Sequence, residues 1–288
     1  MKLSIIIVNW NTKELAIKCV DSVLRERPDF DFEIIVVDNA SRDGSAEALS
    51  EKFGHSANIT IIKSATNLGF GKACNKAFEK SSGEFVLFLN PDARVLPGAL
   101  FELTRFLEIN QDAGVVGPKL LNLDGTLQKS VRNFPDIWSS LLVFTGFHRV
   151  FRPSKYYRDD FSYDTVCEVE QIMGAALMTR RVIIQKLGLF DEKFWLWYEE
   201  VDFCRRVKQA GSKVMFDPRA QIEHCVGKSF EQFGVYERKK TLARSLTYYF
   251  QKNGRPWEVM LLNLILPFVL FAARIMDLIN INAPKSHV

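Results

Sequence analysis

The sequence predicts an α/β fold in which a mainly parallel central sheet is flanked by helices. Four short apolar runs, rich in Ile, Val and Phe, have the length and composition of buried strands: residues 3–10, 33–39, 58–64 and 84–90. Three stretches between them carry apolar side chains at helical spacing: residues 13–25, 45–53 and 72–81. Strands and helices that alternate in this way form parallel sheets with both faces covered.

The second half of the chain predicts a less regular arrangement. We expect a helix from Pro97 to about Asn110, a strand over residues 115–121, and a hairpin turn with Asp124-Gly125 at its apex. Residues 130–168 are rich in Phe, Tyr, Arg and Trp without a clear period, which indicates a variable, partly mobile insertion. Regular structure resumes after it, at residues 169–179, with helices at 181–187 and 199–210 and a strand at 213–217.

The C-terminal segment differs from the rest in composition. Residues 233–252 look helical and combine basic with aromatic side chains, and residues 259–273 are apolar apart from Asn263. That second helix would cover about 22 Å, short of the roughly 30 Å hydrocarbon core, and Pro267 would interrupt it. We therefore expect an in-plane or re-entrant membrane helix; the alternative is a helix packed on the rest of the chain or in an oligomer interface.

Composition and charge narrow the functional class. With 47% hydrophobic and 25% charged residues, the chain is globular rather than disordered. From Tyr236 to Val288 there are eight Lys and Arg against three Asp and Glu, and the rest of the chain is nearly neutral. This uneven charge disfavours a nucleic-acid binder and favours contact with a local anionic surface such as a membrane. Five scattered cysteines, and an N-terminal apolar run too short for a signal peptide, favour the cytoplasm.

Polar side chains follow each of the four predicted parallel strands: Asn9 and Asn11, Asp38, Asn67, and Asn90 with Asp92. Ligands of parallel sheets bind beyond these carboxyl ends. Asp92 is placed to hold a divalent cation that bridges two phosphates, and Asp38 to accept a hydrogen bond from a ribose hydroxyl or a base N–H. The alternatives are an ordinary Asn-Pro-Asp turn and an Asx turn or helix cap.

Two further clusters carry chemistry. Glu199 and Glu200 stand beside aromatic residues at a predicted helix start, where paired carboxylates shift each other's pKa and one becomes a general base. A solvated helix start is the alternative, but it leaves the aromatic residues unexplained. Later in the chain, His224 is a candidate metal ligand and Lys228 a candidate phosphate contact, although a lone His is more often structural.

In this order, these motifs resemble the family 2 glycosyltransferases of the GT-A (Rossmann-like) fold, especially the rhamnosyltransferase-like branch. The matching segments are SIIIVNWN at 4–11, IVVDNASRDGS at 35–45, NLGFGKACN at 67–75, LNPD at 89–92, GAALM at 174–178, the whole of 190–206, and HCVGKS at 224–229. The resemblance covers residues after 233 only loosely, through members with membrane-associating C-termini.

The resemblance implies inverting transfer of a sugar from a nucleotide-sugar donor. Asn90-Pro91-Asp92 stands where the family has D-x-D, so Asp92 and His224 become metal ligands for Mg²⁺ or Mn²⁺; Asn in place of the first Asp lowers the charge at the ion. The implied donor contacts are Asn9, Asn11, Asp38, Asn67, Asn90, Asp92 and Lys228.

By the same resemblance, Glu200 is the catalytic base, although the family usually has Glu-Asp here, and Glu199 is the fallback. The implied acceptor contacts are Gly174, Asp191, Trp197 and Glu199. The first expectation for the sugar is rhamnose from a dTDP-linked donor, with UDP- and GDP-linked donors left open. The acceptor is expected to be a polyprenyl-diphosphate-linked glycan in bacterial cell-surface polysaccharide biosynthesis.

The expected organisation is a glycosyltransferase domain over residues 1–232 and a basic, hydrophobic helical segment over 233–288. The domain divides into a nucleotide-binding half (1–95) and an acceptor-binding half (96–232). The segment would hold the protein peripherally on the cytoplasmic face of the inner membrane.

The sequence disfavours three other functions. A dehydrogenase is disfavoured because Gly69-Phe70-Gly71 lacks the third glycine of a dinucleotide fingerprint and residues 9–12 contain none. A sugar nucleotidyltransferase would also need a glycine-rich loop after the first strand. A catalytically inactive membrane scaffold is the remaining alternative, disfavoured because Asp92, Glu199, Glu200 and His224 are intact.

Overall fold

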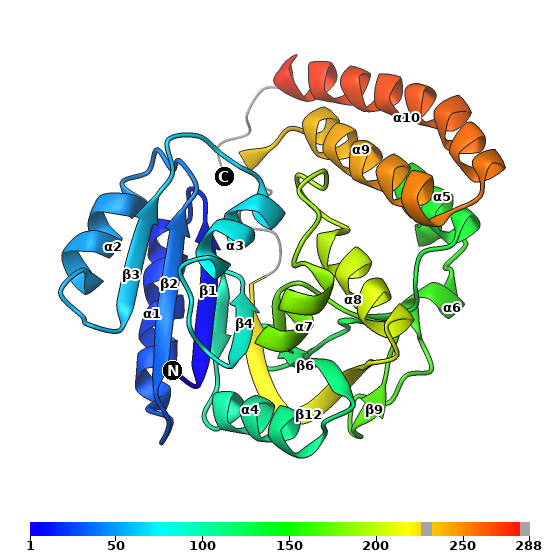
Figure 1. The fold of residues 1–288 in the computed structure, drawn as a ribbon. Coiled ribbons are helices and arrows are strands. Elements are labelled where there is room, and N and C mark those ends of the chain that lie inside the picture. The colour runs from blue at the N-terminus through cyan, green and yellow to red at the C-terminus, as the bar shows by residue number, and fades with distance from the viewer. Residues whose placement is uncertain (226–231, 283–288) are drawn as a thin grey trace.

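A ten-stranded sheet runs through the centre of the molecule in the computed structural model, which describes residues 1–225 and 232–282 (Figure 1). The strands are β1 (Leu3–Asn9), β2 (Phe32–Asp38), β3 (Ile59–Lys63), β4 (Phe85–Leu89), β5 (Ala93–Val95), β6 (Ala113–Leu121), β7 (Leu127–Gln128), β9 (Cys167–Glu168), β11 (Ala176–Arg180) and β12 (Lys213–His224). The short strands β8 (Val131–Arg132) and β10 (Gln171–Ile172) form a separate pair. The helices are α1 (Lys13–Glu26), α2 (Ser45–Phe53), α3 (Phe70–Phe78), α4 (Ala99–Ile109), α5 (Ile137–Thr145), α6 (Ser154–Tyr157), α7 (Arg181–Leu187), α8 (Glu199–Gln209), α9 (Val235–Asn253) and α10 (Pro256–Asn282).

The N-terminal half of the sheet is parallel, in the order β3-β2-β1-β4. Along β1, Ile5 and Ile7 face a core that includes residues of α1 and α4, whereas Ile6 and Val8 face a second core with residues of α3 and α8. Because both faces are covered, β1 and β4 are buried along their whole length. Asn9 pairs with Asp38 in register, so the polar strand ends meet at one edge.

The predicted α/β arrangement with a mainly parallel central sheet is confirmed, and two strands of the main order, β11 and β5, run against the others. Strand β11 lies antiparallel between β4 and β6, and β5 lies antiparallel to β12. The apolar composition of a buried strand does not reveal its direction, so the sequence could not show this. The position of β11 beside β4 matters for the site. The N–H of Asn90, just after β4, donates to the carbonyl of Ala175, just before β11, at 2.9 Å, and this holds Asn90 close to Gly174.

Strand β12 is longer than predicted, because it continues past residue 217 to His224. A register shift between Asp217 and Gln221 accommodates the extra residues. The fully buried carboxylate of Asp217 accepts hydrogen bonds from the Arg219 guanidinium. A polar residue before a proline looks like a strand end, but here it forms a bulge.

Residues 130–168 contain more regular structure than predicted. Helix α5 begins after Asp136, whose carboxylate accepts hydrogen bonds from the N–H groups of Trp138 and Ser139, both at 3.0 Å. The rings of Phe161 and Tyr163 pack edge-on against Phe216 of β12. These two aromatic residues pack against the sheet from a loop, so their contacts leave no period in the sequence. By contrast, the hairpin turn at Asp124-Gly125 is confirmed, joining β6 to β7.

Helices α9 and α10 form an antiparallel hairpin along one side of the molecule (Figure 1). The carboxylate of Asp277, near the end of α10, accepts hydrogen bonds from the N–H groups of Val235 and Tyr236 at the start of α9. Pro267 lies inside α10 without interrupting it, which corrects the prediction of a broken helix. Within the described residues, one helix is long and apolar enough to cross a membrane, over the 24 residues Pro256–Ile279.

The hairpin shares a third core with the rest of the chain. Leu246, Tyr249 and Phe250 of α9 are buried together with Leu141 of α5 and Val201 of α8. Helix α9 is therefore integrated into the fold, while the outer face of α10 remains exposed. The predicted domain boundary at residue 233 remains a prediction, but it does not coincide with a gap in packing.

We predict that Leu246→Ala lowers the free energy of unfolding by about 2–5 kcal/mol, because the side chain is 1% exposed in this shared core. Leu264→Ala on α10, where the side chain is 64% exposed, is the matched control and should change it by less than about 0.5 kcal/mol. Urea denaturation followed by circular dichroism measures both. Equal, small effects would mean that α9 does not stabilise the main body.

Candidate active site

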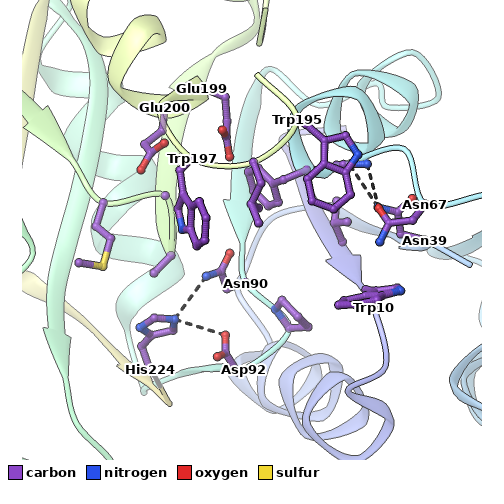
Figure 2. A pocket seen from close by; sticks show the side chains of 18 of the residues that line it. Trp10, Asn39, Asn67, Asn90, Asp92, Trp195, Trp197, Glu199, Glu200 and His224 are labelled. Atoms are coloured by element: carbon purple, nitrogen blue, oxygen red, sulfur yellow. Dashed lines mark hydrogen bonds and ion pairs between the residues drawn. The ribbon is translucent and has the colours of Figure 1, made fainter. Parts of the chain in front are cut away.

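A cavity of about 300 Å³ lies where the carboxyl ends of the parallel strands face the start of α8 (Figure 2). Eight of the predicted site residues line it: Asn67, Asn90, Asp92, Gly174, Trp197, Glu199, Glu200 and His224. These residues are up to 157 positions apart in the sequence, and three structural features bring them together: the strand ends, the β10–β11 junction and the loop before α8.

Asn90, Asp92 and His224 form a compact polar cluster on one wall (Figure 2). His224 pairs with Ala93 across β12 and β5, which places its ring beside Asp92. Its Nε2 atom lies 3.3 Å from Oδ1 of Asp92 and 3.3 Å from Nδ2 of Asn90. Asp92 and His224 are only 7% and 5% exposed, so this is an enclosed pair.

Gln128 fixes the protonation pattern of the His224 ring. Its amide nitrogen donates to the carbonyl of His224 and to Oδ1 of Asn122, both at 3.0 Å, so its oxygen is the atom that faces Nδ1 of His224 at 2.7 Å. That oxygen can only accept, so Nδ1 carries the hydrogen of the neutral ring, and Nε2 is the nitrogen left to bind a metal. A metal-binding imidazole needs this tautomer.

The donor set fits a divalent cation. Nε2 of His224 and a carboxylate oxygen of Asp92 face each other at 3.3 Å, and both are atoms that bind divalent cations. Across the described part of the chain, no group of three or more His, Cys, Asp or Glu side chains is placed to hold a metal. Two protein ligands match Mg²⁺ or Mn²⁺, which take remaining ligands from substrate phosphates and water.

Glu199 and Glu200 lie on the opposite wall, at the first turn of α8 (Figure 2). The residues before them, Trp197 and Tyr198, have φ values of 66° and 73°, a left-handed conformation unusual for side chains of this size. This turn places both carboxyl groups at the cavity rather than in solvent.

The two carboxyl groups have different electrostatic surroundings. Burial, and then the neighbouring Glu200, raise the pKa of Glu199 well above its usual value, and its Oε2 atom is buried without a hydrogen-bond partner. Burial also raises the pKa of Glu200, but hydrogen bonds from backbone N–H groups, including that of Gly174, and the positive charge of Arg132 oppose it. Glu200 is therefore the more acidic of the two and holds its negative charge more readily.

Helix α3 holds one side of the loop formed by residues 190–198. The N–H of Phe70 donates to the carbonyl of Trp195 at 2.9 Å, and the side chain of Asn75 donates to the carbonyl of Phe190 at 2.9 Å. Gly69 has a φ of 78°, and a Cβ there would lie 2.2 Å from the Trp195 carbonyl oxygen. Only glycine permits this approach.

Helix α9 holds the other side of that loop. Ser245 donates to the carbonyl of Leu196 at 2.7 Å. Tyr248 and Lys252 each reach a carboxylate oxygen of Asp191 at 2.8 Å, and Lys252 also lies 2.9 Å from Asp202. Although burial acts to raise the pKa of Asp191, hydrogen bonds from Lys252 and Tyr248 hold it below its usual value.

Some predicted site residues lie elsewhere. Asp191 is engaged with α9 and does not line the cavity. Asn9 and Asp38 are buried and bonded to each other at 3.0 Å, and Asn11 bonds to Gln232 at 2.9 Å; none of these three lines the cavity. Lys228 falls outside the described residues.

Sequence reasoning missed several other lining residues, among them Trp10, Asn39, Arg132, Trp195 and Phe233. Asn39 donates to Oδ1 of Asn67 at 3.0 Å, and Trp10 stacks on Phe233 with ring centroids 5.0 Å apart. Trp10 and Asn39 stand at predicted strand ends and were recognisable from that position. Arg132 and Phe233 reach the cavity only through the packing of distant segments, which no local pattern reveals.

Comparisons with known proteins agree with this geometry. The family model described as glycosyl transferase family 2 matches residues 4–184. The chain is 27% identical over 221 residues to an N-acetylglucosaminyl-diphospho-decaprenol L-rhamnosyltransferase of Mycobacterium tuberculosis, covering 70% of this chain and 68% of that protein. It is 30% identical over 196 residues to a poly(ribitol-phosphate) beta-glucosyltransferase of Bacillus spizizenii, covering 64% of this chain and 31% of that one.

Among solved structures, a mannosyltransferase from Pyrobaculum calidifontis, in complex with GDP-Man and Mn²⁺, superposes with a TM-score of 0.61. It is 18% identical, and the match covers 99% of this chain and 76% of that one. At that identity the likeness shows the fold alone. The family match is what assigns the chain, which belongs to glycosyl transferase family 2 and is a glycosyltransferase.

We predict that Glu199→Gln stabilises the protein at neutral pH. When the pKa of a carboxyl group is raised in the folded state, the protein loses stability as the pH rises from the unfolded-state pKa of about 4.3 through the folded-state pKa. The amide of Gln does not ionise, so the variant avoids this loss. The variant should exceed wild type in free energy of unfolding at pH 8, and the difference should vanish below about pH 4. Urea denaturation across pH 4–8 measures it, with the exposed Glu51→Gln as control; a pH-independent difference would contradict the assignment.

Proposed function

We propose that this glycosyltransferase moves a sugar, with inversion, from a nucleotide-sugar donor to a polyprenyl-diphosphate-linked glycan, in the synthesis of cell-surface polysaccharide. The observation that carries the proposal is one cavity with a carboxylate base on one wall and a cation-binding pair on the other (Figure 2). This arrangement provides a proton acceptor for the attacking group and a counter-charge for the leaving group. Rhamnose is the proposed sugar, supported by the mycobacterial relative.

Glu200 is the proposed base, with Glu199 in second place. The hydroxyl oxygen of the acceptor bonds to C1 of the sugar while its proton passes to the Glu200 carboxylate, and the C1–O bond to the diphosphate breaks. Attack from the face opposite the diphosphate inverts the configuration at C1. The neighbouring backbone N–H groups and Arg132 oppose the rise in the pKa of Glu200 that burial causes, and so favour the ionised form that a base requires.

Asp92 and His224 are the residues that would hold Mg²⁺ or Mn²⁺, with Asn90 beside them. A bound divalent cation supplies positive charge that offsets the charge developing on the departing diphosphate. Gln128 contributes by bonding Nδ1 of His224, which leaves Nε2 as the nitrogen that would bind the ion. Because Asn90 replaces a carboxylate, the site carries less negative charge than a pair of aspartates would.

The nucleotide is proposed to bind at the wall formed by Asn39, Asn67 and the aromatic side chains of Trp10 and Trp195. The two amides are joined by a hydrogen bond, and each has remaining capacity to bond a base or ribose. These contacts suit dTDP-, UDP- or GDP-linked donors alike, so the choice of nucleotide falls to experiment.

We further propose that the protein sits on the cytoplasmic face of the membrane with α10 in the plane of an anionic bilayer. The outer face of α10 is a strip of exposed apolar side chains, formed by Met260, Leu264, Phe268, Phe271 and Ile275. Its sequence spacing of three or four residues gives one continuous stripe. Trp257 and Trp138, at the α5 end of the hairpin, add aromatic rings of the kind that favour the membrane interface.

The packing of α10 supports the in-plane orientation. Its inner face, at Leu262, Leu266 and Ala273, is buried in the hairpin. A transmembrane orientation would carry the exposed charges of α9, among them Arg238 and Arg244, into hydrocarbon, or strip α10 from its partner. In the plane, the same basic residues face anionic lipid headgroups instead.

We predict that one class of nucleotide sugar raises the melting temperature of the wild type in the presence of Mn²⁺, and that Asp92→Ala abolishes this shift. A ligand at one hundred times its Kd adds about 2.7 kcal/mol to the free energy of unfolding. Thermal shift with dTDP-, UDP- and GDP-sugars, with Mn²⁺, Mg²⁺ or EDTA, measures it; the exposed Asp29→Ala is the control. Glu200→Gln should bind the donor as wild type does and transfer sugar about 10²–10⁴ times more slowly.

If no nucleotide sugar shifts the wild type, the transferase proposal fails and an inactive membrane scaffold becomes the better interpretation. Donor binding with unchanged transfer in Glu200→Gln would instead remove Glu200 from its role and leave Glu199.

For the membrane, we predict that replacing Leu264, Phe268 and Phe271 together with Ser weakens co-sedimentation with phosphatidylglycerol vesicles at least tenfold. Each side chain is 64–71% exposed, so the fold should be retained. Deleting the tail is a poorer test, because α9 also supports the cavity. Phe101→Ser, at a 40% exposed phenylalanine on α4, is the control; vesicle binding by the triple variant equal to wild type would contradict the proposal.

A further inference from the structure

A second cavity, of about 230 Å³, adjoins the first on the side of Glu200. The two share Arg132, Met173, Trp197 and Glu200 in their walls. The second cavity is formed by β8, α5, α8 and α9, on the side where the tail hairpin packs (Figure 1). It therefore leads from the proposed base toward the elements that carry the exposed apolar surface.

Three polar atoms of this cavity are left without hydrogen-bond partners. The hydroxyl groups of Ser130 and Ser140 and Nε of Arg132 are buried and unpaired, and the two serines are only 2% and 7% exposed. A buried polar atom without a partner costs about 1–3 kcal/mol, and more when the group is charged. Three such atoms around one cavity indicate that it takes a polar ligand.

The charge of Arg132 specifies the sign of that ligand. Its guanidinium lies 5.8 Å and 5.5 Å from the ring centroids of Tyr156 and Tyr157, and it interacts electrostatically with Glu200. A guanidinium forms its strongest hydrogen bonds, often bidentate, with phosphate and carboxylate. Two serine hydroxyls beside it add neutral donors, an arrangement suited to phosphate oxygens.

The remaining wall is apolar. Val143 and Phe144 of α5 face Leu242 and Leu246 of α9 across the cavity. The cavity thus joins an anion-binding end to a hydrocarbon-lined end. A phosphate attached to an aliphatic chain has this combination, whereas a free sugar or a nucleotide base does not.

We propose that this second cavity binds the diphosphate, and the first lipid carbons, of the polyprenyl-linked acceptor, with Arg132, Ser130 and Ser140 as the phosphate contacts. The inference rests on the proposed function and deepens it, because it assigns the acceptor a site separate from the donor. Bound there, the acceptor presents its sugar to Glu200 from the side opposite the donor phosphates. Arg132 binds substrate in this assignment, and its effect on Glu200 is additional.

The first test is binding of geranyl diphosphate by the full chain, measured calorimetrically with the nucleoside diphosphate and Mn²⁺ already saturating. The wild type should bind it, and Arg132→Gln should weaken binding at least tenfold. The double variant Ser130→Ala/Ser140→Ala should weaken it less. Arg105→Gln, at an exposed arginine on α4, should match wild type. Nucleotide-induced thermal shift, unchanged in each variant, shows that it is folded.

Further arms identify the source of the diphosphate. Inorganic pyrophosphate should bind more weakly than geranyl diphosphate, because it makes no contact with the apolar wall. The affinity for geraniol, which has no phosphate, should be the same in wild type and in Arg132→Gln. If geranyl diphosphate displaces the nucleotide and Arg132→Gln has no effect, the diphosphate binds only at the donor site and the proposal is overturned. Because this assay needs no transfer, failure of the proposed reaction would not by itself produce that result.

Kinetic measurements separate the two roles that Arg132 could have, which are binding the acceptor phosphate and acting through Glu200. Arg132→Gln should raise KM for a lipid-diphosphate acceptor at least tenfold and leave KM for the same glycan on a phosphate-free alkyl chain unchanged. Unchanged KM for both acceptors, with an equal loss of kcat and a shifted pH profile, would show that Arg132 acts only through Glu200, and would overturn the assignment.

Discussion

The cavity depends on how firmly the loop of residues 190–198 is held, because this loop carries two of its tryptophans and presents both glutamates. Its backbone adopts left-handed angles at Trp197 and Tyr198, a conformation that an isolated peptide would leave. Helix α3 bonds to it at Phe190 and Trp195, and helix α9 bonds to it at Asp191 and Leu196. The strained turn is maintained by contacts from both ends of the chain.

Two carboxyl groups in adjacent positions acquire different properties from this one constraint. Both are removed from water, and burial alone would protonate both. Gly174 lacks a side chain, and its N–H bonds the Glu200 carboxylate, while Arg132 adds a positive charge. Glu199 has an unpaired oxygen instead. Two residues of one type thus differ in pKa because the N–H of Gly174 and the charge of Arg132 act on Glu200.

The sequence predicted the parallel half of the sheet and the polar strand ends, because period and composition are local properties. Asn90, Asp92 and Asn67 reach the cavity for that reason. It also placed Asp38 in the site, whereas the structure bonds its carboxylate to Asn9 beneath the cavity, a pairing that depends on the register of two strands. Arg132 was missed because its segment has no periodicity, and α10 was expected to break at Pro267 because its support from α9 cannot be read from α10 itself.

The packing of Leu262, Leu266 and Ala273 against the rest of the hairpin fixes the outer stripe of α10 relative to the cavity. If that stripe rests in the bilayer, Glu200 stands at a constant height above the lipid surface. The protein then selects acceptors by the distance of their terminal hydroxyl group from the membrane. An acceptor whose terminal hydroxyl lies too near the membrane, or too far from it, misses the base, so the number of sugars already present on the lipid would decide whether another is added.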